Sequence, residues 1–194
     1  MKTIGVLNLQ GAVSEHITML AKLVNIQPKL IKHPKDLSSI DGLIIPGGES
    51  TALSRLIKEN NLYQPIQQFA NTGKGILGTC AGLVLCGKST TDITQKDQEV
   101  TPLGLMDIIV ERNGFGRQID SFETELNIER IGEQIPAIFI RAPYIAELGK
   151  DVIPLSYVDN HCVIAQSNNI LACSFHPELT LDLRIMQYFT KQFC

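Results

Sequence analysis

The sequence predicts an α/β fold with three layers, in which a mainly parallel central sheet is flanked by helices and the second half of the chain is rich in strands. Two observations carry this prediction. In roughly the first ninety residues, short apolar runs alternate with segments of helical periodicity, as in a parallel sheet covered on both faces. After Leu103, strand-like runs follow one another with turns between them. The chain contains no repeat, low-complexity tract or flexible linker, so we expect residues 1–194 to form a single domain.

The first half is predicted to contain four short strands: Thr3–Leu9, Lys29–Lys32, Gly42–Ile45 and Lys74–Thr79. Between the first two, apolar residues at helical spacing share one face of a helix: Val13, Ile17, Leu20 and Val24. Pro46–Gly48 ends the third strand, and Ser50 or Thr51 can cap the helix that follows it. The fourth strand leads through Cys80 into a helix of small residues, Ala81–Cys86.

Six strands are predicted for the second half: Asp107–Glu111, Phe122–Ile128, Ala137–Ile140, Val152–Val158, Cys162–Gln166 and Ile170–Ser174. Asp159-Asn160 and Asn168-Asn169 supply the turn residues of hairpins. The chain closes with a helix whose apolar residues recur every four positions, at Leu181, Ile185, Phe189 and Phe193.

Composition excludes several function classes. Seventeen basic and twenty acidic residues give a net charge of −3, and this balance argues against general nucleic-acid binding. The longest uncharged apolar run, Gly75–Gly87, is shorter than the roughly 20 residues of a membrane span, so no membrane association is expected. The apolar stretch Thr3–Leu7 is too short for a signal peptide. Five cysteines without metal-ligand spacing fit reduced thiols, so we expect a cytoplasmic protein.

Cys80 is the candidate nucleophile. It stands in Gly78-Thr79-Cys80-Ala81-Gly82, the thiol counterpart of a nucleophile elbow, between a strand and a helix. In such a sharp turn, side chains at the two glycine positions would collide with neighbouring segments. The turn projects the sulfur from the sheet at a helix N-terminus, which favours the thiolate. The alternative is a buried cysteine in a glycine-rich turn.

His176 is the candidate base. It follows the last predicted strand in Phe175-His176-Pro177-Glu178, and in an extended segment His176 and Glu178 point the same way. The carboxylate can then orient the imidazole and stabilise the imidazolium. The alternative is a histidine at a strand end beside a helix-capping glutamate. The other histidines are expected to be exposed or capping residues: His16, His33 and His161.

An elbow cysteine followed by a distant His-Pro-Glu has the order and spacing of the class I glutamine amidotransferases. The sequence resembles one family among them, the glutaminase subunits of two-component pyridoxal 5′-phosphate synthases. The matching segments run in order along nearly the whole chain: Leu9–His16, Pro46–Thr51, Gly78–Gly82, Arg112–Gln118, Phe139–Pro143 and Phe175–Thr180. Gly114 and Leu181 depart from the residues usual in this family, and neither belongs to the triad.

The resemblance implies a class I glutamine amidotransferase-like, flavodoxin-like fold and hydrolysis of L-glutamine to glutamate and ammonia. By similarity, Cys80 is the nucleophile, His176 the general base and acid, and Glu178 its orienter. The oxyanion donors are backbone N–H groups of Gly47 or Gly48 and of Ala81. The residues around the substrate are Gly47, Gly48, Glu49, Arg112, Ile140 and Arg141. Arg117 also lies in a family motif, with surface ion pairing as its alternative. Neither a metal nor a cofactor is implied.

The resemblance also implies a partner, a (β/α)₈-barrel synthase subunit that receives the ammonia. We expect weak activity until docking completes the oxyanion hole, with the segment Gln10–His16 near the interface. The alternatives are a glutaminase subunit of another amidotransferase, a cysteine peptidase or chaperone of similar architecture, and a non-catalytic binding module of the same fold.

Overall fold

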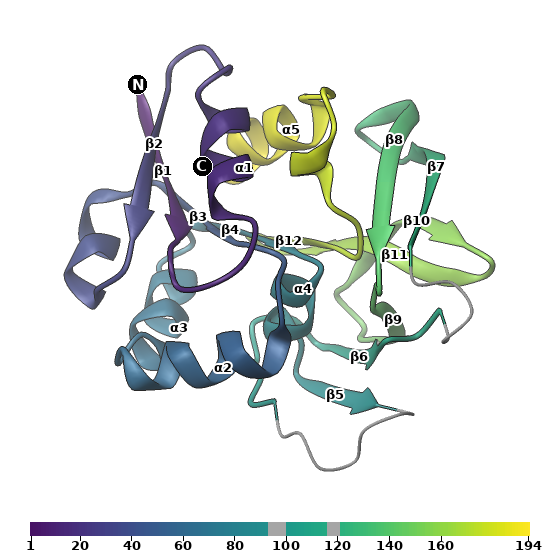
Figure 1. The fold of residues 1–194 in the computed structure, drawn as a ribbon, viewed down its shortest axis with the longest axis horizontal. Coiled ribbons are helices and arrows are strands. Elements are labelled where there is room, and N and C mark those ends of the chain that lie inside the picture. The colour runs from purple at the N-terminus through teal and green to yellow at the C-terminus, as the bar shows by residue number, and fades with distance from the viewer. Residues whose placement is uncertain (93–99, 116–120) are drawn as a thin grey trace.

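A main sheet and a separate two-stranded ribbon form the β-structure of the computed structural model, which describes residues 1–92, 100–115 and 121–194 (Figure 1). The main sheet has the strand order β2-β1-β3-β4-β12-β11-β9-β6-β5, and β10 pairs with β11. Its strands are β1 (Lys2–Leu7), β2 (Ile26–Ile31), β3 (Gly42–Ile45), β4 (Gly75–Thr79), β5 (Ser89–Asp92), β6 (Ile108–Arg112), β9 (Tyr144–Leu148), β10 (Ile153–Val158), β11 (His161–Ser167) and β12 (Ile170–Cys173). The ribbon consists of β7 (Ser121–Ile128) and β8 (Gly132–Ile140).

The main sheet changes character at β12. The strands from β2 to β12 are parallel, whereas β12–β11, β11–β9 and β9–β6 are antiparallel pairs. The predicted turns at Asp159-Asn160 and Asn168-Asn169 do connect antiparallel neighbours. Asp159, Asn160 and Asn168 all have positive φ, the conformation that asparagine and aspartate tolerate best after glycine.

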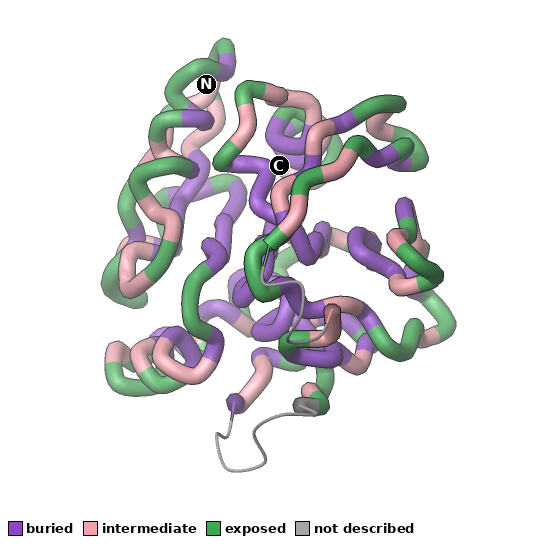
Figure 2. Tube along the Cα trace, turned by 45° about the vertical axis from the view of Figure 1, so that its right-hand side comes forward, coloured by how far each residue is buried: buried purple, intermediate pink, exposed green. Residues whose placement is uncertain are grey.

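Helices cover both faces of the parallel half (Figure 1). On one side lie α1 (Val13–Leu20) and α5 (Arg184–Gln192), and on the other lie α2 (Ser50–Glu59), α3 (Tyr63–Asn71) and the short α4 (Ala81–Cys86). Two 3₁₀ turns complete the described elements, at Pro34–Ser39 and Pro177–Leu179. Figure 2 shows the buried stretches gathered along the central strands.

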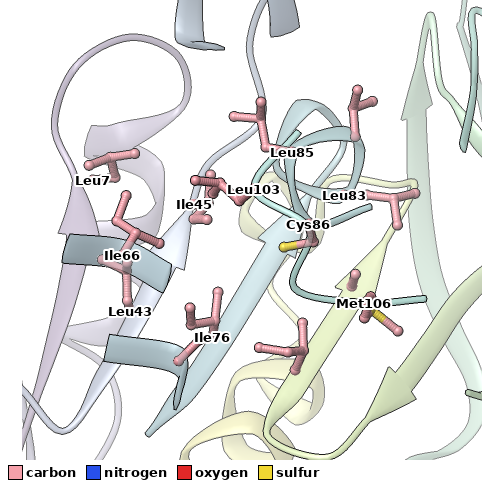
Figure 3. Packing of buried hydrophobic residues seen from close by; sticks show 14 of the residues in the cluster. Leu7, Leu43, Ile45, Ile66, Ile76, Leu83, Leu85, Cys86, Leu103 and Met106 are labelled. Atoms are coloured by element: carbon pink, nitrogen blue, oxygen red, sulfur yellow. The ribbon is translucent and has the colours of Figure 1, made fainter. Parts of the chain in front are cut away.

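Each face of the sheet carries its own hydrophobic core. In β3, Leu43 and Ile45 face the core beneath α2, α3 and α4 (Figure 3), whereas Ile44 faces the core beneath α1 and α5. This follows from the alternation of side chains along a strand, and it explains why the strand is a continuous apolar run. The two cores hold β3 and β4 rigidly in the centre of the protein.

Three local predictions are wrong. Helix α1 ends at Leu20, so Val24 lies in the following loop and is 86% exposed. Leu181 precedes α5 and is 88% exposed. Helix α2 is capped by neither Ser50 nor Thr51. Glu49 is its N-cap, because the Glu49 carboxylate accepts hydrogen bonds from the N–H groups of Thr51 and Ala52.

Candidate active site

The site begins where two parallel strands end side by side. Strands β4 and β12 pair in parallel with Thr79 opposite Cys173, so the residues that follow both strands emerge at one edge of the sheet. The N–H of Cys80 donates to the carbonyl of Cys173 over 2.8 Å. Cys80 and His176, far apart in the sequence, are thereby brought together.

Cys80 has the strained backbone expected of an elbow. Its φ of 50° and ψ of −105° lie outside the regions that side chains favour. The predicted need for small flanking residues is confirmed by the geometry. A Cβ at Gly78 would lie 2.6 Å from the carbonyl oxygen of Gly82, and one at Gly82 would overlap the carbonyl oxygen of Ile45. The surrounding chain therefore enforces the turn that presents the Cys80 sulfur.

His176 and Glu178 form a buried pair. The Nδ1 atom of His176 lies 2.7 Å from Oε1 of Glu178. Burial alone lowers the pKa of His176, but hydrogen bonds to Cys80 and Glu178 and the charges of both groups outweigh it and raise the pKa to about 10. The segment is not extended as predicted, because Pro177–Leu179 forms a 3₁₀ turn after His176. The turn nevertheless brings both side chains together.

A pocket of about 540 Å³ opens beside the Cys80 sulfur. Six of the predicted site residues besides Cys80 and His176 line it: Gly48, Glu49, Ala81, Arg112, Ile140 and Arg141. The pocket also contains residues that were not predicted to contact the substrate, among them Gln10, Ser50, Val84, Asn113 and Pro143. All of these except Val84 lie in the family-like segments, and this was the sequence signal that could have identified them. Arg117 falls outside the described residues.

Two charged side chains that line the pocket, Glu49 and Arg112, lie close together. Arg112 is buried, and its Nη2 lies 3.2 Å from the Thr51 hydroxyl and 3.9 Å from Oε1 of Glu49. Burial would raise the pKa of Glu49, but hydrogen bonds from Thr51 and Ala52 and the Arg112 charge lower it overall. Glu49 is thus an anion and Arg112 a cation, a pair suited to the two charges of an amino acid.

Gly47 lies against the reacting groups without room for a side chain. A Cβ there would overlap Cε1 of His176 and approach the Cβ of Cys80 to 3.2 Å. Its N–H donates to the Thr79 hydroxyl over 3.0 Å, and its carbonyl accepts from Ala12 over 2.9 Å. The Gly47 N–H is therefore already engaged, which leaves Gly48 as the better of the two predicted oxyanion donors on this loop.

The remaining histidines differ from one another. His33 is a cap, as predicted, at the N-terminus of the turn Pro34–Ser39. His161 is partly buried and stacks on Tyr144 with ring centroids 3.9 Å apart. The prediction for His16 is wrong, because its side chain is fully buried and its Nε2 lies 3.5 Å from Oε2 of Glu178. The burial arises because helix α1 packs on the turn that carries Glu178.

In the described part of the chain, none of the other four cysteines has a side chain beside it that is placed to act as a catalytic base. All are free thiols, and burial raises the pKa of Cys86 to about 12 and that of Cys162 to about 11. Among the described residues, no cluster of three or more His, Cys, Asp or Glu side chains could hold a metal ion. Among the same residues, no helix has the length and hydropathy to cross a membrane.

Comparisons with known proteins show relatives over nearly the whole chain. A curated relative from Oceanobacillus iheyensis, named pyridoxal 5′-phosphate synthase subunit PdxT, is 52% identical over 96% of this chain and 90% of its own length. A relative of the same name from Ruminiclostridium cellulolyticum is 46% identical over 98% and 99% of the two chains.

Solved structures agree as well. One described as a glutamine amidotransferase superposes with a TM-score of 0.89 at 37% identity, covering 97% of each chain. PurLQS from Thermotoga maritima, at 16% identity, shares the fold with a TM-score of 0.72 over 98% and 99% of the two chains. The predicted α/β fold is confirmed. The SNO glutamine amidotransferase family matches residues 6–194, and the chain belongs to this family.

Proposed function

We propose that this chain hydrolyses L-glutamine through Cys80, His176 and Glu178 and passes the ammonia to a synthase subunit. It is a glutaminase subunit of pyridoxal 5′-phosphate synthase, in line with curated relatives of that name at about 50% identity over nearly the full chain. The observation that carries the catalytic assignment is that Cys80 and His176 line one pocket and that Glu178 pairs with His176 through Nδ1.

The first half-reaction forms a thioester. A protonated His176 beside Cys80 favours the thiolate, which attacks the side-chain carboxamide carbon of glutamine. His176 then protonates the departing nitrogen, because an amide ion is too poor a leaving group. Glu178 holds the imidazole by its Nδ1 and stabilises the imidazolium before this transfer. Ammonia and a γ-glutamyl thioester on Cys80 result.

The second half-reaction releases glutamate. Water, deprotonated by His176, attacks the thioester carbonyl and regenerates the thiolate. Each step passes through an oxyanion, and we assign the N–H groups of Gly48 and Ala81 as the donors that stabilise it. Ala81 follows the nucleophile directly, the usual position of such a donor. In other enzymes, loss of one donor costs about 3–4 kcal/mol of transition-state stabilisation.

The substrate's charged end is assigned to the mouth of the pocket. Glu49 is placed to accept the α-amino group, and Arg112 or Arg141 to bind the α-carboxylate. Ile140 closes the wall near Cys80, since its carbonyl oxygen lies 3.9 Å from the sulfur. Gly47 supports the site by leaving space for the His176 ring.

The product requires a partner. Ammonia released into neutral water is almost wholly protonated and no longer nucleophilic, so a synthetic glutaminase must deliver it through a protected route. We propose a (β/α)₈-barrel synthase subunit as the acceptor, with Gln10–His16 near the interface. Gln10 supports this placement, because its side-chain oxygen accepts the N–H of Glu49 at the pocket mouth. We place this single-domain subunit in the cytoplasm.

The test is glutamate release with and without the synthase subunit. The wild-type complex should release glutamate much faster than the free chain, and Cys80→Ala should abolish release while still binding the synthase. Cys194→Ala, which removes a half-buried sulfur at the chain end, is the matched control and should keep wild-type activity. Release by Cys80→Ala, or inactivity of the wild-type complex, would refute the assignment. Activation by the barrel of another amidotransferase instead would identify a different partner.

A further inference from the structure

A buried polar group stands behind the triad, on helix α1. The His16 side chain is fully buried, and its Nε2 faces two oxygen atoms. Oε2 of Glu178 lies at 3.5 Å and the Thr79 hydroxyl at 3.2 Å. Neither contact belongs to the three roles of a Cys-His-Glu triad. A fully buried imidazole is costly to desolvate, so its position next to Glu178 requires an explanation.

The surroundings determine which nitrogen carries the proton. Nδ1 of His16 is buried and has no hydrogen-bond partner in the part of the chain that the structure describes. A proton on Nδ1 would therefore be a buried donor without an acceptor, and the Nε2 lone pair would face a carboxylate. With the proton on Nε2, the N–H faces two oxygen atoms and the unpaired lone pair lies on Nδ1, away from the carboxylate. Burial lowers the pKa of His16 and Glu178 opposes this only in part, so the ring stays neutral.

The Nε2–H of His16 is a hydrogen-bond donor for the Glu178 carboxylate, which has one oxygen without such a donor. Its Oε1 binds His176, whereas its Oε2 is buried and lacks a hydrogen bond among the described residues. The separation of 3.5 Å between His16 Nε2 and this oxygen is long for a hydrogen bond, and catalytic hydrogen bonds often shorten when substrate binds. The Thr79 hydroxyl also accepts the N–H of Gly47, so the same nitrogen is tied to the pocket loop.

We propose that His16 is a positioning residue of the glutaminase site. Its Nε2–H faces the second oxygen of Glu178 and the Thr79 hydroxyl, and it fixes the Glu178 carboxylate behind His176. The inference rests on the proposed function, because His16 acts through Glu178 and touches no substrate. The charged groups that face it are Glu178, His176 and, on its own helix, Glu15.

Two substitutions separate positioning from packing. His16→Leu keeps the bulk and removes the N–H, whereas His16→Gln places an amide N–H near the position of Nε2. In the synthase complex, His16→Leu should lower kcat about 10–100-fold with KM for glutamine within about twofold, and His16→Gln should recover most of the loss. His33→Leu, at the exposed cap of Pro34–Ser39, is the matched control and should leave kcat unchanged.

A second readout does not depend on turnover. It is the rate at which iodoacetamide alkylates Cys80 at about pH 6, measured by mass spectrometry of the peptide that contains Cys80. This rate depends on the fraction of Cys80 present as the thiolate, which His176 and Glu178 support. His16→Leu should slow it and His16→Gln should restore it. If His16→Leu does not fold, His16→Asn, whose shorter amide cannot reach Glu178, takes its place.

The outcomes are distinct. Wild-type kcat and alkylation in His16→Leu, or equal losses in the Leu and Gln variants, would overturn the inference in favour of packing. A raised KM for glutamine with an unchanged kcat would also overturn the inference. If the wild-type complex released no glutamate, the proposed function would fail. The alkylation series would still test whether His16 supports the Cys80 thiolate.

Discussion

The two sides of the pocket are built by different kinds of sheet. Cys80 and His176 follow β4 and β12, parallel neighbours whose register is unbroken over four residue pairs. Across the pocket, on what we call the antiparallel side, Arg112 ends β6 and Ile140 ends β8. Strand β6 pairs antiparallel with β9, with a shift of register, and parallel with β5, whereas β8 belongs to the antiparallel ribbon. The parallel side can therefore fix distances between reacting atoms, and the antiparallel side supplies a wall.

Burial differs in the same direction. Cys80, His176 and Glu178 are all buried, whereas Ile140 is 38% exposed and Arg141 is exposed. Arg112, which is buried, is the exception on the antiparallel side. Substitutions on the parallel side should consequently change kcat, because they move reacting groups. Substitutions on the antiparallel side should change KM, because they remove binding that is equal in the ground state and the transition state.

The largest effect after loss of the nucleophile is expected for Glu178→Gln. The amide keeps the shape of the carboxylate but loses the charge that stabilises the His176 imidazolium and fixes its tautomer. We expect kcat to fall on the order of 10³- to 10⁴-fold with little change in KM, measured as glutamate release in the complex. Glu147→Gln, at an exposed position of β9, is the control. A Glu178→Gln enzyme within tenfold of wild type would show that the parallel side does not set the rate.

Gly47→Ala tests the parallel side by steric overlap alone, because it changes no charge. The added methyl group overlaps the His176 ring and must displace it from Cys80. A displacement of about 1 Å in a reacting group can cost about 10²-fold in kcat. Gly73→Ala is the control, since Gly73 has a positive φ that alanine disfavours but no atom lies within 4 Å of its added Cβ. It should lose stability and keep kcat, and an unchanged kcat in Gly47→Ala would contradict the proposed geometry.

The features that could be predicted from the sequence are those determined by residues close to one another in the chain. The strand Gly42–Ile45 and the helix Ala81–Cys86 were predicted with the bounds they have. The glycines around Cys80 carry the same kind of information, because their backbone contacts forbid side chains. The pairing of His176 with Glu178 also follows from two residues close in sequence.

The rest depends on contacts between distant segments. The strand β9 (Tyr144–Leu148) is mostly outside the apolar cores and is defined by pairing with β6 and β11, so its sequence contains little strand pattern. His16 is buried against Thr79 and Glu178, residues that the fold brings to it from distant parts of the chain. Helix α3 (Tyr63–Asn71) was missed because its apolar face is short, with only Ile66, Phe69 and Ala70 buried.

On the antiparallel side, the arginines provide the corresponding test. Arg112→Lys and Arg141→Lys keep the charge but lose the planar fork that binds a carboxylate bidentately. The arginine that holds the substrate carboxylate should show a KM raised about tenfold, equivalent to about 1.4 kcal/mol, with kcat nearly unchanged. Arg130→Lys, in the turn between β7 and β8, is the control. A loss of kcat without a change in KM would remove the distinction between the two sides.

The smallest effect concerns stability, where the two buried histidines should act in opposite directions. The pKa of His176 is raised from 6.5 to about 10 in the folded chain, so its stabilisation is complete below about pH 6.5 and is lost as pH rises toward 10. The pKa of His16 is lowered, so stability falls when pH drops below about 6.5 and the unfolded chain alone takes up the proton. Urea unfolding followed by circular dichroism should therefore show that His176→Gln flattens the alkaline side of the stability profile and His16→Gln the acidic side. If both variants changed the same side of the stability profile, the two rings would share one environment. The separation of His16 from the reacting pair would then be wrong.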